Sequence, residues 1–215
     1  MAAAPADRSR SLDHIRLATV LLDLVMGHPA LARLRAATTA EARGLVLELG
    51  CGTGRNFPLY RGPATVFAID PDEGHLGRAK ARAATAAVPV VPIAASAEAL
   101  PFPDSSLDAV VSTWCLCSIP DLDRALAEVR RVMRPGAPWW FVEHGLCPDP
   151  RVARWQRRLT PLWQRLAGGC RLDRPIAERL ARAGFRLERL ETGKLVPGPR
   201  LAAWTYLGLA CKPEA

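Results

Sequence analysis

After an apolar run of the sequence, three glycines occupy alternate positions. The run 45–49 leads into Gly50, Gly52 and Gly54 in "LVLELGCGTGRN". Glycine has no Cβ, so such a loop can turn tightly and let a ligand approach its backbone. Asp70 ends the next apolar run, about 20 residues after the first glycine, which is the spacing that places a carboxylate on ribose hydroxyls. The pattern predicts a site for a ligand that carries a nucleoside.

The spacing of the glycines narrows the class of ligand. The dinucleotide pattern GxGxxG needs a glycine at position 55, where this chain has Arg55. The loop also lacks the Lys and Ser/Thr pair that cradles phosphates in nucleoside triphosphate sites. Glu48 has the wrong charge for a pyrophosphate and suits a cationic ligand or a network that holds an ammonium group. A glycine turn that only packs a helix on a strand is the alternative, which the position of Asp70 disfavours.

Apolar runs alternate with amphipathic segments along most of the chain. We expect strands over 44–50, 65–70, 88–95, 105–114 and 138–145, with the prolines of 88–95 near its ends. Helices are expected over 11–37 (a pair), 53–62, 74–87, 121–136, 149–168 and 174–185, and two final strands over 186–195 and 202–212. This alternation is typical of an α/β fold with helices on both faces of a parallel sheet. The sequence thus predicts a Rossmann-like, mostly parallel seven-stranded sheet with an antiparallel last strand.

Four segments together resemble the successive motifs of the class I S-adenosylmethionine (SAM) dependent methyltransferases. They are "VLELGCGTGRN", "VFAIDPDEGHL", "ASAEALPFPDSSLDAVVS" and "EVRRVMRPGAPWWFVEH", in this order across residues 44–144. The resemblance implies that SAM is the methyl donor and S-adenosylhomocysteine the product. Ser96 departs from the family, which usually has an acidic residue there. The implied cofactor-binding residues are Glu48, Gly50, Cys51, Gly52, Gly54, Asn56, Asp70, Pro71, Leu76, Ser96, Ala97, Glu98, Thr113, Trp114 and Cys115.

The resemblance also suggests how the single domain 1–215 is organised. We expect an N-terminal helical cap over 1–43 and a SAM-binding core over 44–144. A helical insertion over 149–172 would cover the acceptor site, and a C-terminal helix with two strands would fill 173–215.

The second half of the chain is similar to the small thiol S-methyltransferases. The matching residues are Cys117, Ser118, Glu143, His144, Trp155, Gln156, Pro161, Trp163, Gly169 and Cys170. This likeness implies methyl transfer to a small lipophilic acceptor, a thiol first of all. Phospholipid N-methyltransferases and quinone-type C- or O-methyltransferases share much of the pattern and are the enzymatic alternatives. A SAM-binding regulatory subunit is the non-enzymatic alternative.

Glu143 and His144 close the expected strand 138–145, where a base and its orienting carboxylate could serve as the catalytic pair. In the alternative, one of them only holds loop backbone. Trp155 and Trp163 are expected to form an apolar acceptor pocket together with Cys117, although they could equally be core residues. We expect Cys115 and Cys117 to pack rather than act as nucleophiles.

Composition limits the partners. The formal charge of +8 comes almost entirely from arginine and lacks an aromatic-interleaved basic run, so we expect no nucleic-acid partner. A peripheral contact with anionic lipid headgroups is left open, as is the oligomeric state. We expect no membrane span from the apolar window 17–26, which is too short, and no signal peptide from the polar residues 1–11. Six cysteines without zinc-type spacing indicate free thiols in the cytoplasm and no metal.

Overall fold

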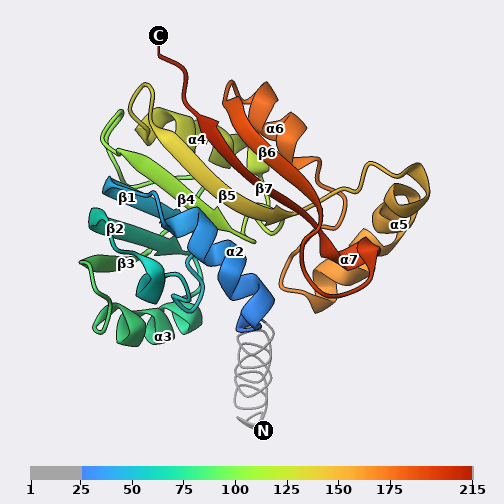
Figure 1. The fold of residues 1–215 in the computed structure, drawn as a ribbon, viewed down its shortest axis with the longest axis horizontal. Coiled ribbons are helices and arrows are strands. Elements are labelled where there is room, and N and C mark those ends of the chain that lie inside the picture. Colours follow the sequence, from blue (N-terminus) through green and yellow to red (C-terminus); the bar gives the residue numbers. More distant parts are fainter. Residues whose placement is uncertain (1–25, 215) are drawn as a thin grey trace, which may run out of the picture.

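A computed structural model describes residues 26–214 of the chain (Figure 1). The strands are β1 (Gly44–Leu49), β2 (Pro63–Asp70), β3 (Val90–Ala94), β4 (Ala109–Thr113), β5 (Pro138–His144), β6 (Arg186–Lys194) and β7 (Trp204–Cys211). The helices are α2 (Pro29–Thr39), the 3-10 turn η1 (Phe57–Leu59), α3 (Glu73–Ala83), α4 (Leu122–Val132), α5 (Pro150–Leu166), α6 (Ile176–Arg182) and α7 (Arg200–Ala203).

All seven strands form one sheet in the order β3-β2-β1-β4-β5-β7-β6. The first five are parallel, whereas β7 runs antiparallel to both β5 and β6. The predicted fold class is therefore confirmed. The strand order reverses direction between β1 and β4, and ligands of open α/β sheets bind at such a switch point, beyond the carboxyl ends of the strands.

Alternate residues of the central strands enter two separate cores, one on each face of the sheet. Leu47, Leu49 and Val110 pack with the buried side chains of α4 and α6. Val46 and Val111 point the other way and pack with residues of α3 and η1. Side chains alternate between the faces of a strand, so neighbouring residues at the end of a strand also face opposite sides. This alternation decides which polar side chains meet at the site.

Helices α3 and α4 begin at aspartate caps that the sequence places just before them. Asp72 accepts hydrogen bonds from two amides at the start of α3, and Asp121 accepts one at the start of α4. On α4 the apolar residues Leu122, Ala125, Leu126 and Val129 recur at helical spacing, and all four are buried. Capping and amphipathic periodicity thus explain these helices from local sequence.

A few expectations differ from the structure. Only Phe57–Leu59 of the helix expected over 53–62 forms, because Gly54 adopts a positive φ of 82° and ends any helix there. Pro92 lies in the middle of β3 rather than at its end, which is tolerated because β3 is an edge strand. The short helix α7 (Arg200–Ala203) was not expected, and it takes up the first two residues of the strand expected over 202–212. The first of the two N-terminal helices falls mostly outside the described residues, and none of the helices between residues 26 and 214 is long and apolar enough to cross a membrane.

Candidate functional site

The glycine loop joins β1 to η1 at the switch point of the sheet. Gly50, Gly52 and Gly54 all have positive φ, at 59°, 53° and 82°. A Cβ on Gly50 would lie 2.4 Å from the Cβ of Cys115, so the loop after β4 requires a glycine there. A Cβ on Gly52 would meet nothing within 4 Å. The backbone at Gly52 therefore borders open space that a ligand can approach.

Asp70 ends β2 beside this loop. Its Oδ2 accepts the Gly52 amide at 2.8 Å, and its Oδ1 accepts the Asp72 amide at 3.0 Å. His75 Nδ1 lies 3.4 Å from Oδ1, and hydrogen bonding to this carboxylate raises the pKa of His75. The carboxylate and the loop backbone form one surface, as the spacing of the sequence predicts.

Glu48 lies beneath the loop in a buried polar network. Its carboxylate accepts hydrogen bonds from the Tyr60 hydroxyl at 2.9 Å and from Asn56 Nδ2 at 3.1 Å. Burial raises the pKa of Glu48 to about 7. A cationic ligand group nearby would favour the ionised carboxylate, so this residue suits a positively charged ligand.

Arg35 of α2 closes the same network from the other side. Its Nη1 donates to Asn56 Oδ1 at 3.1 Å and to Thr113 Oγ1 at 2.8 Å. Its guanidinium also lies 4.8 Å from the centre of the Trp114 ring. Trp114 has a positive φ of 53°, an uncommon conformation for a residue other than glycine and one typical of functional sites. Sequence reasoning missed Arg35 and Tyr60, because no local pattern marks either residue.

The residues expected at the adenine follow β2 and β3. Leu76 is buried on α3, whereas Pro71 is exposed at the end of β2. Ser96 Oγ accepts the Glu98 amide at 3.2 Å. The Glu98 carboxylate accepts the Asp121 amide at 2.6 Å, so it stabilises the start of α4. Both side chains thus bind neighbouring backbone amides.

The structure does not bring Glu143 and His144 together. They are consecutive residues of β5 and face opposite sides of the sheet. Glu143 is buried, which raises its pKa well above the usual value, and it accepts the Leu116 amide at 3.0 Å and the Cys115 thiol at 3.7 Å. Glu143 therefore does not orient His144, as one expectation had it. It holds the backbone of the loop after β4, which was the alternative.

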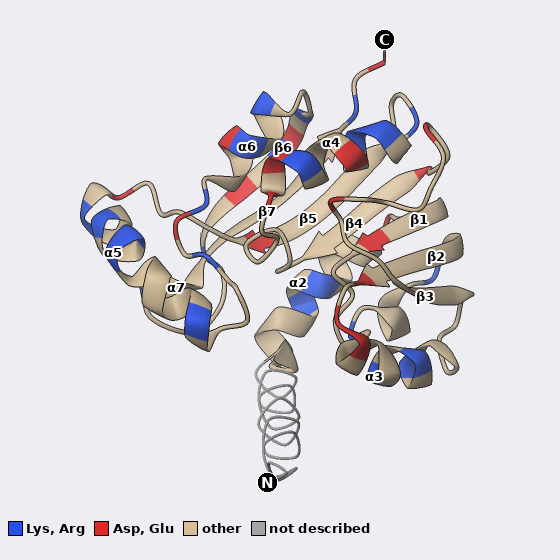
Figure 2. Cartoon of the chain, turned by 180° about the vertical axis from the view of Figure 1, so that it is seen from behind, with Lys and Arg blue, Asp and Glu red and all other residues tan. Residues whose placement is uncertain are grey.

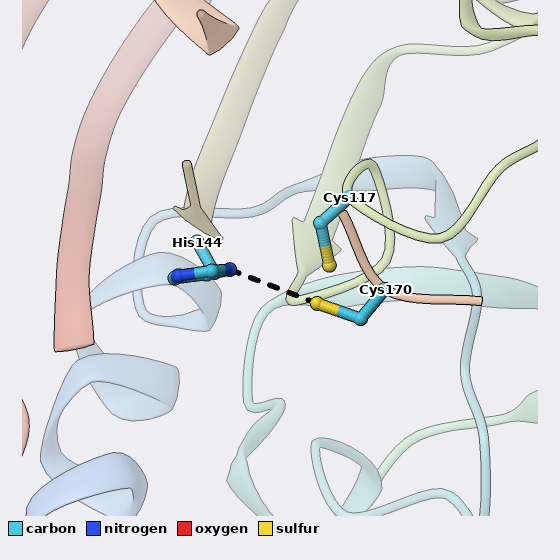
Figure 3. Close-up of side chains that lie close together, drawn as sticks. All are labelled: Cys117, His144 and Cys170. Atoms are coloured by element: carbon cyan, nitrogen blue, oxygen red, sulfur yellow. Dashed lines mark hydrogen bonds between the residues drawn. The ribbon is translucent and has the colours of Figure 1, made fainter. Parts of the chain in front are cut away.

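His144 instead meets two cysteines (Figure 3). Its Nδ1 lies 3.6 Å from the Sγ of Cys170, and a ligand atom of each of Cys117, His144 and Cys170 lies within 4.8 Å of the others. We call these three residues the thiol–imidazole cluster. They come from the loop after β4, the end of β5 and the loop after α5, so the sequence spacing gave no sign of the cluster.

Comparisons with known proteins agree with a nucleoside-ligand site. The family described as "Methyltransferase domain" matches residues 47–141. The chain is 34% identical over 164 residues to human thiol S-methyltransferase TMT1B, which covers 74% of this chain and 67% of that protein. It is 35% identical over 169 residues to phosphatidylethanolamine N-methyltransferase of Cereibacter sphaeroides, covering 77% of this chain and 81% of that protein. The chain belongs to the SAM-dependent methyltransferases.

The fold of this methyltransferase is also found in a solved structure. A geranyl diphosphate methyltransferase in complex with SAM superimposes with a TM-score of 0.68 at 14% identity, over 85% of this chain and 84% of that chain. The residues present here fit the methyl donor of the family. The open space at Gly52 would let the donor approach the loop backbone. The carboxylate of Asp70 suits its ribose hydroxyls, and the buried acid Glu48 suits its positive charge.

The two tryptophans of α5 lie in different surroundings in this methyltransferase. Trp163 is next to the thiol–imidazole cluster. Hydrogen bonding with Cys117, and to a smaller extent with Trp163, lowers the pKa of Cys170. Trp155 is 55% exposed, with the Arg158 guanidinium 5.6 Å from its ring centre. Eight residues along a helix turn a side chain by about 80°, which separates the two rings. Trp155 is therefore neither a core residue nor a wall of a closed pocket, and only Trp163 remains a candidate for the acceptor pocket.

Proposed function

We propose that this methyltransferase transfers the methyl group of SAM to a small lipophilic thiol. The thiol–imidazole cluster carries the proposal. Cys115 lies close to Gly50 of the glycine loop, and Cys117 of the cluster follows it by two residues along the chain. An acceptor that enters between α5 and the sheet would meet this cluster. The likeness to thiol S-methyltransferases supports the same acceptor class.

Chemical reasons favour a thiol. A thiol with a pKa near ~8.5 is already partly thiolate at neutral pH and needs only modest activation. In the thiol–imidazole cluster, His144 offers an imidazole at the place where such an acceptor would lie. Among the described residues, its Nε2 is buried and lacks a hydrogen-bond partner. This nitrogen can hold a proton beside the acceptor.

Residues of the chain would hold the donor as follows. The backbone of the glycine loop would contact its amino-acid part, with Glu48 beneath the loop favouring positive charge. Asp70 would hold the ribose hydroxyls, and the segment 96–98 with Leu76 would border the adenine. SAM supplies a methyl group already activated on a sulfonium, so the protein mainly aligns the reactants and excludes water.

N-methylation of an amino-lipid is the second candidate. The match to phosphatidylethanolamine N-methyltransferase covers 81% of that relative, whereas the match to TMT1B covers 67% of the human protein. An amine acceptor, however, gives the two cysteines beside His144 no evident use. The thiol therefore stays the first choice.

An assay with methyl-labelled SAM distinguishes the acceptors. The purified protein would be offered alkyl thiols, vesicles of phosphatidylethanolamine and quinol-like phenols in parallel. We expect label in the thioether product and little in the lipid or the phenol. Transfer to phosphatidylethanolamine with none to thiols would overturn the proposal. His144→Gln should slow thiol methylation at least tenfold and leave SAM affinity within about twofold, since Gln fits the site without an imidazole's proton chemistry.

A further inference from the structure

The thiol–imidazole cluster has the dimensions of a metal site. A zinc ion bound to one thiolate at ~2.3 Å and one imidazole at ~2.0 Å with tetrahedral angles separates the sulfur and nitrogen by about 3.5 Å. The distance from Cys170 Sγ to His144 Nδ1 is 3.6 Å, and the Cys117 sulfur lies within 4.8 Å of both. The three ligand atoms are thus preorganised around a common point.

Hydrogen bonds outside the cluster hold its three segments in place. The Arg171 amide donates to the Cys117 carbonyl at 2.9 Å, which joins the loop after α5 to the loop after β4. Arg174, itself 8% exposed, donates to the Leu116 carbonyl at 2.5 Å and also to the Ile119 carbonyl. With Glu143 on the Leu116 amide, these contacts fix the backbone on both sides of Cys117. These contacts hold the backbone of the segments that carry the ligands, and so limit where the ligand atoms can lie.

We propose that Cys117, His144 and Cys170 bind a zinc-type divalent cation and leave a fourth position open to the acceptor sulfur. Two thiolates and one imidazole with an open position form a donor set of catalytic zinc sites. Soft sulfur ligands select zinc over magnesium or calcium. Neither the fold nor the relatives' names assign a metal to this protein.

The role of the ion in catalysis rests on the proposed thiol acceptor. A thiol that binds the cation loses its proton to solvent, because a coordinating thiol is deprotonated outright. The bound sulfur then forms a bond to the methyl carbon, while the carbon–sulfonium bond breaks and its electron pair stays on the sulfur of the donor. The neutral thioether product is a weak ligand and leaves the fourth position.

Metal binding can be measured without any acceptor. The full-length protein would be purified in reductant, dialysed against zinc, and assayed for zinc by plasma mass spectrometry. We expect one equivalent, and the cobalt-substituted protein should show a thiolate-to-metal charge-transfer band. Cys117→Ser and Cys170→Ser should each weaken zinc binding at least tenfold. Cys211→Ser, at the far end of β7, should not change it.

Several results would overturn the metal site. They are zinc content below a tenth of an equivalent, equal zinc binding by the Cys170→Ser variant, or a disulfide between Cys117 and Cys170 in place of a bound ion. SAM affinity of each variant, measured by calorimetry, shows whether it has folded. Full thiol methylation by zinc-free protein would remove the catalytic role of the ion and leave the proposed function standing. Stoichiometric zinc without thiol methylation would leave the metal site standing and overturn the proposed thiol acceptor.

Helix α5 carries a second, independent observation. Within the described chain, Trp155, Leu162, Trp163 and Leu166 are exposed large hydrophobic side chains, at 55%, 57%, 36% and 75%. Three of them, Trp155, Leu162 and Leu166, fall within about 40° of one another around the helix. The buried side chains of α5 are the small or polar Ala153, Gln156 and Thr160. The helix thus turns its apolar face outward, the reverse of an ordinary surface helix.

The charge of α5 indicates what covers this face. The helix carries Arg151, Arg154, Arg157, Arg158 and Arg165 and no acidic residue, as the blue bands on α5 in Figure 2 show. Apolar residues beside arginines are typical of helices that lie in the interface of a bilayer. A second copy docked through α5 would place these arginines against one another. Charge complementarity therefore favours an anionic surface.

We infer that α5 lies on an anionic lipid surface with the outward face of Trp155, Leu162 and Leu166 among the headgroups. Trp163, on the same helix, borders the thiol–imidazole cluster. A lipophilic acceptor dissolved in the bilayer would then reach the cluster along α5.

Vesicle co-sedimentation tests this inference. The protein should bind vesicles that contain phosphatidylglycerol at least tenfold better than pure phosphatidylcholine vesicles, and rising salt should weaken the binding. The double variant Trp155→Ser/Leu166→Ser should lose at least tenfold in affinity, whereas Leu190→Ser, an exposed leucine on β6, should bind as the wild type does. Absence of vesicle binding, or a dimer in ultracentrifugation that the double variant dissociates, would overturn the inference.

Discussion

The carboxylate of Asp70 accepts a hydrogen bond from the backbone amide of Gly52, with 2.8 Å between Oδ2 and the nitrogen. Asp70 ends β2 and Gly52 lies in the loop after β1, so the two residues meet where these neighbouring parallel strands end. Gly52 has a positive φ, and its missing Cβ leaves open space on the side away from packed protein. The bond therefore fixes the loop in a shape that exposes its backbone beside a carboxylate.

Gly52→Ala and Gly50→Ala should affect different properties. Alanine at either position costs about 1 kcal/mol in backbone strain because of the positive φ. At Gly52 the new methyl group enters the space for the donor, so SAM affinity should fall at least tenfold. At Gly50 it collides with Cys115, so unfolding in urea should show the larger loss of stability. Equal SAM affinities of Gly52→Ala and the wild type would contradict the placement of the donor.

Glu48 should make the stability of the protein depend on pH. Its pKa is about 7 in the folded protein and about 4.5 in the unfolded chain, so the folded state holds the proton more tightly. The free energy of unfolding therefore loses this contribution as the pH rises from about 4.5 to 7, and the loss is constant above that. Glu48→Gln removes the titration. The stability of the variant relative to the wild type should rise by about 3 kcal/mol between pH 4.5 and pH 8.

Urea unfolding at a series of pH values measures this difference without added SAM. Tyr60→Phe serves as a control, because it removes a hydrogen bond to Glu48 but leaves the carboxyl group able to titrate. A difference between Glu48→Gln and the wild type that does not change with pH would show that Glu48 titrates normally.

Features that depend on local sequence could be predicted, and features that depend on side chains from distant segments could not. The glycine loop, Asp70 and the stripe of α4 follow from spacing and periodicity within a few turns of chain. The thiol–imidazole cluster requires three loops to meet, which no spacing records. The separation of Glu143 from His144 could have been foreseen, because consecutive residues of a strand face opposite sides.

Replacement of Glu143 by glutamine should disturb the protein less than replacement by alanine. Glu143→Gln keeps an acceptor for the Leu116 amide, and the raised pKa means that the wild-type carboxyl group is largely uncharged. We expect its kcat to fall less than tenfold. Glu143→Ala leaves a buried amide unpaired and should cost about 1–3 kcal/mol in urea unfolding. A loss of 10²-fold or more in the kcat of Glu143→Gln would instead make Glu143 a proton-transferring group, since a lost general base costs about that much.

Gln156 should anchor α5, because its buried amide serves three backbone groups. Its Oε1 accepts the Cys147 amide at 2.8 Å, and its Nε2 donates to the carbonyls of Gly145 and Leu201, each at 3.1 Å. Gln156→Leu has a similar volume but leaves all three unpaired, at a cost of about 3 kcal/mol.

Hydrogen exchange would locate the effect of this change. We expect amides of α5 and α7 to exchange faster in Gln156→Leu, while those of β1 and the glycine loop keep the protection of the wild type, since Gln156 contacts neither. Gln164→Leu is the matched control, because the Gln164 side chain is only partly buried and makes no such set of bonds among the described residues. Thiol methylation should slow in Gln156→Leu with unchanged SAM affinity, because α5 carries Trp163 beside the cluster. Faster exchange spread over the whole sheet would mean that Gln156 supports the global fold rather than the position of α5.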